Sequence, residues 1–318
     1  MHRPFPEARG STPGLVVDIS PASAGWEFCG LTVLELQAGV PQDIVTGDSE
    51  YFVLPLQAGL RVDVMAVSEP DTIEDTFELQ GRAHVFDRIT DFCYAGRDSI
   101  VRLTSDLPAV VALPNARCST RLSPRYGPAE GVPVEVRGAG EATRQVTNFG
   151  VPGVWDHVEK LICCELITPA GNWSSYPPHK HDPTAPCPVV NEEIYYYRIS
   201  GADGVTPDRG GVGYHRSYTT GEHEVAGLAS IDVMLEVRDH DVVLVPHGYH
   251  GPCIADPSYS MYYLNVMAGP APGRALNACD DPPHAWIRDS WSGANPDPRV
   301  PVTSADGRCD PHRTGSLR

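Results

Sequence analysis

Hydrophobic positions in this chain come in short runs that end at glycine, proline or polar residues. Residues 192–197 read Glu-Glu-Ile-Tyr-Tyr-Tyr, and residues 242–250 read Val-Val-Leu-Val-Pro-His-Gly-Tyr-His. Aromatic and β-branched residues favour strands, and Pro-His-Gly favours a tight turn. The 31 prolines and 30 glycines add turns and disfavour long helices. The pattern therefore predicts many short strands.

The order of these runs occurs twice along the chain. Each half has a strand with a glycine turn, then a glutamate-led aromatic strand, then an apolar strand with a proline turn. The segments are 34–39, 50–54 and 112–118 in the first half, and 165–171, 193–197 and 244–250 in the second. Matching elements in matching order predict two similar β domains. We expect a first domain at residues 1–125, a second at 126–289 and a polar tail at 290–318.

Composition and charge limit the classes of function. The 318 residues are 41% hydrophobic, which is enough for one large core or two ordinary ones. A formal net charge of −17 argues against nucleic acid as a partner and means that an anionic substrate needs arginine or lysine close by. No stretch approaches a membrane span, and residues 1–7 lack a signal-peptide core, so we expect no membrane partner and a cytoplasmic location. Without a secretory context, the nine cysteines are expected to be reduced thiols.

Three histidines and a glutamate form the strongest candidate site. His179 and His181 stand two apart, which on a strand turns both imidazoles to one face. Glu193 lies at the start of the next predicted strand, and His250 ends the third. This set can hold one divalent metal ion, with Zn, Mn and Fe ahead of Co and Ni, and leave positions open for water or substrate. With 12 histidines in the chain, the alternative is a polar loop with incidental histidines.

The metal is expected in the second half only. Residues 40–49 contain no histidine, and Cys118 stands at the position of the third histidine. Glu50 keeps the glutamate alone. Glu192 is the rival ligand to Glu193, because period two lets only one of them face inward. We choose Glu193 because Glu50 mirrors it.

Basic side chains near these ligands are candidates for binding a substrate. Lys180 and Arg198 could pair with a carboxylate, and Arg274, after the Pro-Gly pair at 272–273, is a third candidate. The alternative for the strand residues is a solvated strand end. Asp182 could fix the tautomer of a ligand imidazole, or it could be a turn residue before proline.

A long and specific motif, Gly-Asn-Trp-Ser-Ser-Tyr-Pro-Pro-His-Lys-His-Asp, occupies residues 171–182. The accompanying segments are residues 135–138, 144–146, 192–198, 241–246, 248–250 and 262–270, with weaker ones at 81–82 and 85–87. Through these segments, the stretch from about Val134 to Trp286 resembles a cupin, specifically the 5-deoxy-glucuronate isomerase family of myo-inositol catabolism.

The resemblance implies an all-β bicupin with two antiparallel β-barrel or double-sheet domains in one chain. It places the metal ligands at His179, His181, Glu193 and His250. It also implies an aldose–ketose isomerase that converts 5-deoxy-D-glucuronate to 5-dehydro-2-deoxy-D-gluconate. The substrate would be a small anionic sugar acid, and we expect a homo-oligomer.

The catalytic side chains stay open at this point. Glu192, Tyr196, Tyr263 and a metal-bound water are candidates for a general base, whereas a hydride shift would need none. The alternative functions are a related uronate ketol-isomerase of pectin breakdown, a cupin oxygenase that uses Fe, and a non-catalytic cupin that binds a sugar acid.

Overall fold

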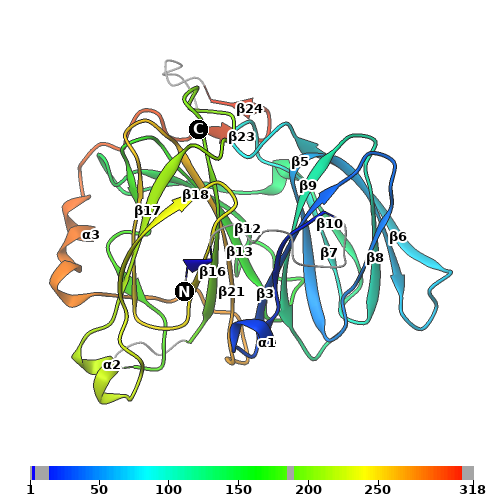
Figure 1. Ribbon diagram of the computed structural model, residues 1–318, viewed down its shortest axis with the longest axis horizontal. Coiled ribbons are helices and arrows are strands. Elements are labelled where there is room, and N and C mark those ends of the chain that lie inside the picture. The colour runs from blue at the N-terminus through cyan, green and yellow to red at the C-terminus, as the bar shows by residue number, and fades with distance from the viewer. Residues whose placement is uncertain (1, 4–13, 185–189, 310–318) are drawn as a thin grey trace.

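The computed structural model describes residues 2–3, 14–184 and 190–309, and strands make up most of its regular structure (Figure 1). Two groups of strands lie side by side, the first half of the chain on the right and the second half on the left. This arrangement confirms the expected all-β fold class. No helix among the described residues is both long and apolar enough to cross a membrane.

The first domain is a nine-stranded sheet ordered β10-β7-β5-β9-β3-β2, to which β4, β6 and β8 attach. Its long strand β5 pairs with β7 and β9 through its first part and with β6 and β8 through its second part. Its interior is filled by apolar side chains such as Leu34, Val53, Val62 and Leu113, all fully buried. The elements are β2 (Leu15–Ile19), α1 (Pro21–Ala24), β3 (Cys29–Leu36), β4 (Gln42–Val45), β5 (Ser49–Ala66), β6 (Ile73–Arg82), β7 (Phe92–Ala95), β8 (Ser99–Thr104), β9 (Ala109–Arg117), β10 (Arg125–Gly127) and η1 (Ala129–Gly131).

The second domain pairs a seven-stranded sheet, β1-β19-β16-β21-β13-β12-β11, with a six-stranded sheet, β18-β17-β20-β15-β22, in which β14 also pairs with β20. Apolar side chains of both sheets share one core. The strands of the first sheet are β1 (His2–Arg3), β11 (Val134–Arg137), β12 (Arg144–Gly150), β13 (Ile162–Thr168), β16 (Glu192–Ile199), β19 (Val242–Val245) and β21 (Met261–Ala268). The other elements are β14 (Trp173–Ser174), β15 (His179–Lys180), β17 (Val212–Tyr218), α2 (Gly221–Val225), β18 (Asp232–Arg238), β20 (Tyr249–Ala255), β22 (Cys279–Asp280), η2 (Pro282–His284), α3 (Trp286–Ser290), β23 (Thr303–Ser304) and β24 (Gly307–Arg308).

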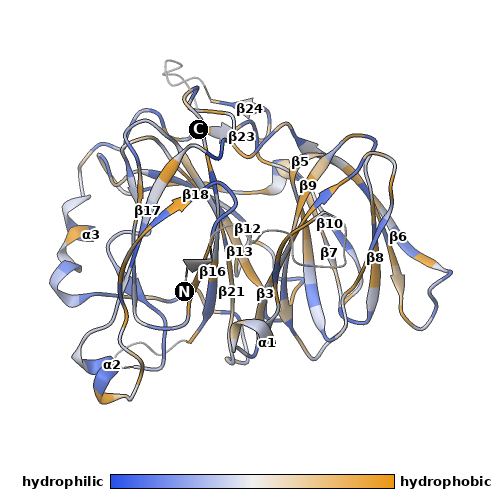
Figure 2. Cartoon of the chain, in the orientation of Figure 1, coloured by the Kyte–Doolittle hydropathy of each residue, from blue (hydrophilic) through white to orange (hydrophobic). Residues whose placement is uncertain are grey.

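Strand β16 is buried on both faces. Ile194 and Tyr196 pack into a core shared with the first domain, whereas Tyr195 and Tyr197 pack into the interior of the second. A strand buried on both faces loses the alternation of polar and apolar residues, which explains the nearly continuous apolar run at this point in the sequence. Hydrophobic positions concentrate in the strands where the two domains meet, and hydrophilic positions in the outer loops and α2 (Figure 2).

Two glutamates join the domains reciprocally. Glu50 on β5 accepts backbone N–H hydrogen bonds from residues 159–161, just before β13, at 2.6 to 2.9 Å. Glu192 on β16 accepts them from residues 27–29, at the start of β3, at 2.7 to 2.9 Å. Each carboxylate therefore holds the segment that leads into a central strand of the other domain, and hydrogen bonds to charged groups are the stronger kind.

This reciprocity corrects the alignment of the repeat. Glu50 lies opposite Ala116 on β9, and Glu192 lies opposite Ala268 on β21. The equivalent of Glu50 is therefore Glu192, one residue before the predicted partner Glu193. The order β7-β5-β9-β3-β2 matches β19-β16-β21-β13-β12, so the two sheets do share a plan.

The segment after α3 packs over both domains. Gln145 Oε1 accepts hydrogen bonds from the backbone N–H groups of Val302 and Thr303, at 2.8 and 2.9 Å, and Ile89 N donates to Ser304 O at 3.0 Å. The predicted domain boundary at 125/126 falls inside β10, which pairs with β7 of the first domain. We propose that the division lies in the connection between β10 and β11.

The cysteines are mostly buried thiols. Those that are free are Cys29, Cys93, Cys118, Cys163, Cys164, Cys253 and Cys309. Cys279 is disulfide-bonded, so the expectation of reduced thiols throughout is wrong at that residue. Burial raises the pKa of Cys164 to about 12, and this thiol is therefore uncharged at neutral pH.

We predict that Glu50→Gln lowers the free energy of unfolding by about 2 to 4 kcal/mol, because a single amide oxygen cannot accept the hydrogen bonds that two carboxylate oxygens now receive. Chemical denaturation measures the change. The matched control is Glu69→Gln, at an exposed position of the same domain, which should stay within about 0.5 kcal/mol of the parent. Equal stability of Glu50→Gln and the parent would contradict the role of Glu50 in holding the two domains together.

Candidate metal centre

Strands β15, β16 and β20 bring the predicted ligands together. His179 on β15 lies directly opposite His250 on β20, and their ring centroids are 4.5 Å apart. His181 follows β15 immediately, and Glu193 is the second residue of β16. His250 therefore lies on a strand, whereas the sequence suggested the turn that follows β19.

One carboxylate oxygen faces two imidazoles. Glu193 Oε2 lies 2.8 Å from His181 Nε2 and 2.9 Å from His250 Nε2, and all three side chains are buried. The other oxygen, Oε1, accepts a hydrogen bond from Asn265 Nδ2 at 2.6 Å. Among the described residues, His181, Glu193 and His250 form the one group of potential metal ligands whose atoms all lie within 4.8 Å of each other.

Backbone carbonyls orient two of the imidazoles. His179 Nδ1 lies 2.9 Å from Pro177 O, and His181 Nδ1 lies 2.9 Å from Asn191 O. A carbonyl oxygen can only accept, so each Nδ1 carries the proton. In a neutral ring this leaves the Nε2 lone pair free for a metal, as the outer hydrogen bond of a ligating histidine usually does.

The donor set fits a divalent metal ion. In the neutral tautomer, the His181 Nε2 lone pair points at a carboxylate oxygen, so the two atoms repel each other unless a cation or an extra proton lies between them. Both ring nitrogens of His250 are buried, and neither forms a hydrogen bond of good geometry among the described residues, although Nε2 lies 2.9 Å from Glu193 Oε2. Buried polar atoms are rarely left unsatisfied, and an ion held by Glu193 and these imidazoles would satisfy them.

The pKa shifts agree with this interpretation. Burial, with a smaller contribution from His250, holds the pKa of His179 well below its usual value, so this imidazole stays neutral. Burial alone would raise the pKa of Glu193, but His250 and His181 lower it overall. For His181, burial lowers the pKa and the contact with Glu193 more than reverses that effect. The carboxylate is therefore charged at neutral pH.

His179, His181 and Glu193 line one wall of a cavity of about 460 Å³ inside the second domain. Three arginines, Arg137, Arg144 and Arg288, also line it, together with Tyr195 and Tyr263. The local charge is thus positive beside an acidic chain, as an anionic ligand requires.

Of the three predicted catalytic side chains, the structure places only Tyr263 at the cavity. Glu192 binds backbone N–H groups of the first domain. Tyr196 lies in the core between the domains, where its hydroxyl is 2.8 Å from His240 Nδ1. Both stand an odd number of residues from Glu193 on one strand, so they face away from the ligands. The assignment of Glu192 and Tyr196 to the site is thereby corrected.

The predicted substrate-binding residues also lie outside the cavity. Arg198 Nε donates to Asp239 Oδ1 at 2.7 Å, on the face of β16 opposite the ligands. Arg274 donates to the backbone carbonyls of Gly150 and Leu161, at 2.9 and 3.2 Å. Lys180 stands between two ligands on one strand and must point the other way. These three assignments are corrected as well.

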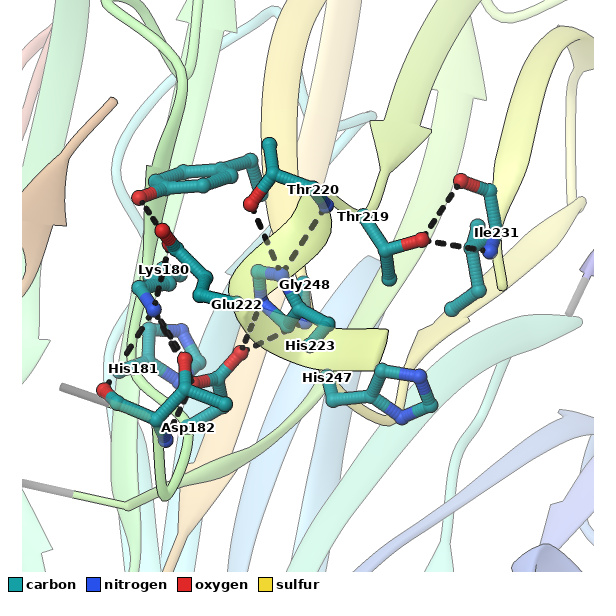
Figure 3. Close-up of polar contacts among 12 residues, drawn as sticks. Lys180, His181, Asp182, Thr219, Thr220, Glu222, His223, Ile231, His247 and Gly248 are labelled. Atoms are coloured by element: carbon teal, nitrogen blue, oxygen red, sulfur yellow. Dashed lines mark hydrogen bonds and ion pairs between the residues drawn. The ribbon is translucent and has the colours of Figure 1, made fainter. Parts of the chain in front are cut away.

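Lys180 is fully buried beside the short helix α2 (Figure 3). Its Nζ lies 3.1 Å from Glu222 Oε1 and 3.6 Å from Asp182 Oδ1, donates to Thr184 Oγ1, and sits 5.3 Å from the centroid of the Tyr249 ring. A buried ammonium needs such partners. Lys180 therefore ties the ligand-bearing segment to α2.

Asp182 is the anionic centre of the same network (Figure 3). Its Oδ2 accepts from Gly248 N at 2.8 Å and from His223 Nε2 at 2.9 Å, while His223 Nδ1 accepts from Thr220 N at 3.1 Å. Asp182 thus fixes the tautomer of His223 rather than that of a metal ligand. Burial alone would raise its pKa, but hydrogen bonds from Thr184 and Gly248 lower it to about 2.

Sequence reasoning missed the cavity arginines and Asn265. Arg137 and Arg144 face each other across β11 and β12, and this cross-strand register is not visible in the sequence. Asn265 lies opposite Tyr195 on the neighbouring strand, where it reaches Glu193. A buried-strand asparagine inside an otherwise apolar run was the one available signal.

Comparisons with known proteins point to one family. The model of the KduI/IolB family matches residues 3–287. The 5-deoxy-glucuronate isomerase of Geobacillus thermodenitrificans is 36% identical over 286 residues, which covers 87% of this chain and 92% of that protein. The 5-deoxy-glucuronate isomerase of Bacillus subtilis is 36% identical over 251 residues, covering 77% and 85%.

Solved structures share the fold. An IolB-like protein from Salmonella typhimurium superposes with a TM-score of 0.75 at 28% identity, covering 90% of this chain and 98% of that one. An oxalate decarboxylase from Lactobacillus farciminis superposes with a TM-score of 0.57 at 9% identity, covering 88% of each chain. At such low identity, the second likeness shows a common architecture and nothing about activity.

We predict that the metal-loaded protein holds about one divalent ion per chain, and that His181→Ala or His250→Ala reduces this to near zero after dialysis, because each removes an imidazole from the set. Elemental analysis by mass spectrometry measures the occupancy. His284→Ala, at a half-exposed position, should keep the ion. Two ions per chain in the parent, or full occupancy in both ligand variants, would contradict the site.

We predict that Asp182→Asn destabilises the metal-free protein by about 2 kcal/mol at pH 7, from the difference between a folded pKa of about 2 and an ordinary value of 3.8. Because the pKa of Asp182 is lower in the folded than in the unfolded chain, its carboxylate stabilises the fold fully at pH values above the ordinary pKa of 3.8. This stabilisation is lost as the pH falls toward 2. The gap between parent and variant should therefore narrow from pH 4 to pH 2 in denaturation experiments. A gap that stays constant or widens over this range would refute the carboxylate's role.

Proposed function

The chain belongs to the KduI/IolB family, and from this premise we propose that it is a metal-dependent 5-deoxy-glucuronate isomerase. It converts 5-deoxy-D-glucuronate to 5-dehydro-2-deoxy-D-gluconate in myo-inositol catabolism. The observation that carries the proposal is the buried Glu193 facing His181 and His250, at the wall of a cavity lined with arginines. The homo-oligomer and the cytoplasmic location stay predictions.

We assign the metal to His179, His181, Glu193 and His250. A divalent ion held there, with Zn, Mn and Fe the first candidates, would act as a Lewis acid and stabilise negative charge that develops on the sugar oxygens. The protein holds the four donors in place with backbone carbonyls behind His179 and His181 and with Asn265 behind Glu193. Donors fixed in this way need no reorganisation during the reaction.

Among the described residues that line the cavity, the side chains outside the ligand set are poorly suited to carry a carbon-bound proton. Glu193 is the only carboxylate among the described residues that line it, and its pKa is lowered. Burial raises the pKa of Tyr263 well above its usual value, so its hydroxyl keeps its proton and can donate a hydrogen bond. Of the residues first considered as a general base, Tyr263 remains at the site, but as a donor.

This environment favours a hydride shift over transfer through a base. The C2–H bond breaks and its hydrogen moves with the electron pair to C1, while the proton on the C2 oxygen moves to the C1 oxygen. Neither a redox cofactor nor an external oxidant is required, because C1 is reduced as C2 is oxidised. Tyr195 and Tyr263, both buried, line the cavity beside the ligands.

We predict that the metal-replete protein converts 5-deoxy-D-glucuronate to the keto acid without oxygen uptake, that EDTA abolishes the conversion, and that a divalent ion restores it. In heavy water, a hydride shift leaves the product without deuterium at C1, which NMR of the product determines.

The possible failures are distinguishable. Deuterium at C1 would replace the hydride shift by proton transfer through a base. Oxygen uptake coupled to product formation would identify an oxygenase, and binding of the sugar acid without turnover would identify a non-catalytic binding protein.

A further inference from the structure

One buried guanidinium in the cavity lacks an anionic partner. Arg144 is 3% exposed and lines the cavity, yet no carboxylate among the described residues forms an ion pair with it. Its Nε is buried without a hydrogen-bond partner in the described part of the chain. Burying an unpaired charge is expensive, and proteins rarely do so without a functional reason.

The neighbouring arginines do not share this deficit. Arg137 forms two hydrogen bonds with Glu135, at 2.6 and 2.7 Å, and Arg288 forms two with Asp280. The three guanidinium groups thus have two carboxylate partners, and one positive charge remains at Arg144. Burial lowers its pKa to about 10, with Arg137 and Arg288 acting in the same direction, so it is still charged at neutral pH.

The fold holds this guanidinium in a fixed place. Arg144 begins β12, and its NH1 and NH2 groups donate to the backbone carbonyls of Ala142 and Tyr176 at 3.1 Å each. Its Cζ atom lies over the Trp291 ring, 5.5 Å from the ring centroid. Backbone oxygens satisfy these hydrogen bonds but supply no negative charge. A guanidinium that is fixed in place and has no anionic partner is preorganised to bind a carboxylate.

A second unsatisfied donor lines the same cavity. The hydroxyl of Tyr263 is buried and has no hydrogen-bond partner among the described residues. Tyr263 lies on β21, which is separated from β12 by β13 alone in the sheet. Arg144 and Tyr263 therefore line the same cavity from one sheet, and each has a donor atom without a hydrogen bond among the described residues.

We propose that Arg144 binds the carboxylate of the sugar acid and thereby sets the specificity of the cavity for acidic over neutral sugars. The inference rests on the proposed function and deepens it, because it names the residue that binds the unreactive carboxylate end of the substrate. A neutral sugar would leave the Arg144 charge buried and unpaired, whereas a carboxylate would neutralise it. Arg137 and Arg288 already pair with carboxylates of the protein, so they contribute to the electrostatic potential in the cavity and need not contact the substrate.

The test uses two ligands that cannot isomerise. One is the sugar acid with its C1 aldehyde reduced to an alcohol, and the other is the matching polyol with an alcohol in place of the carboxylate. Calorimetry on the metal-loaded protein gives both affinities. We expect the parent to bind the acid about 10- to 100-fold more tightly, since a charged hydrogen-bonded contact is at stake. Arg144→Gln should remove this preference, and Arg144→Lys should keep part of it.

Controls separate specificity from folding. Arg102→Gln, an exposed residue paired with Asp43 in the first domain, should bind both ligands like the parent. Thermal melting and metal content verify each variant. If Arg144→Gln does not fold, the comparison of Arg144→Lys with the parent decides the matter.

Two results would overturn the proposal: equal binding of acid and polyol by the parent, or undiminished preference for the acid in a folded Arg144 variant. The proposed function fails separately. A parent that prefers the acid through Arg144 but never isomerises 5-deoxy-D-glucuronate would support the subsite and contradict the isomerase.

Discussion

The buried carboxylate of Glu193, held 2.8 and 2.9 Å from two imidazole nitrogens, is the constraint on which the rest of the structure depends. A negative charge inside a β barrel is unfavourable unless cations or hydrogen bonds surround it. One oxygen is satisfied by Asn265, and the other faces the Nε2 atoms of His181 and His250. A divalent ion satisfies all of them together. The centre therefore requires strands that cannot shift relative to one another.

The first domain supports these strands from the side opposite the cavity. Its interior is apolar, and its outer face packs against the face of β16 and β21 that turns away from the cavity. The reciprocal contacts of Glu50 and Glu192 fix the segments that lead into β13 and β3. Two related domains thus share one core, and in the described part of the chain the group of potential metal ligands lies in the second domain. As a result, the sheet that carries Glu193 is packed on both faces.

The two-residue period of a strand determines which side chains can face the metal ligands. The two-residue spacing of His179 and His181 turns both imidazoles to one face, and the structure places both at the cavity. Strand period also says that only one of Glu192 and Glu193 can face the ligands. It does not say which one, and the likeness to Glu50 that decided for Glu193 belongs to Glu192. The same period already excludes Tyr196, because it stands three residues from Glu193. It likewise excludes Lys180, which lies between two inward-facing histidines. Both residues lie close to the ligands in the sequence, but their side chains point to the opposite face of the strand.

Other features could not be derived from the sequence. The position of His250 on β20 depends on where the turn after β19 ends, and the meeting of Arg137 with Arg144 depends on register between strands. The missing counter-ion of Arg144 becomes visible only when all its neighbours are placed. The repeat was recognised by order, but its register was off by one residue, because Glu50 and Glu192 serve the domain contact rather than the metal.

The most direct test of the metal centre is anomalous X-ray diffraction from crystals of the metal-loaded protein, recorded above and below the absorption edge of the bound ion. The account predicts one anomalous peak per chain, roughly 2.0 to 2.2 Å from Nε2 of His179, His181 and His250 and from a carboxylate oxygen of Glu193. A peak elsewhere in the chain, with His181 and Glu193 still in direct contact, would contradict it.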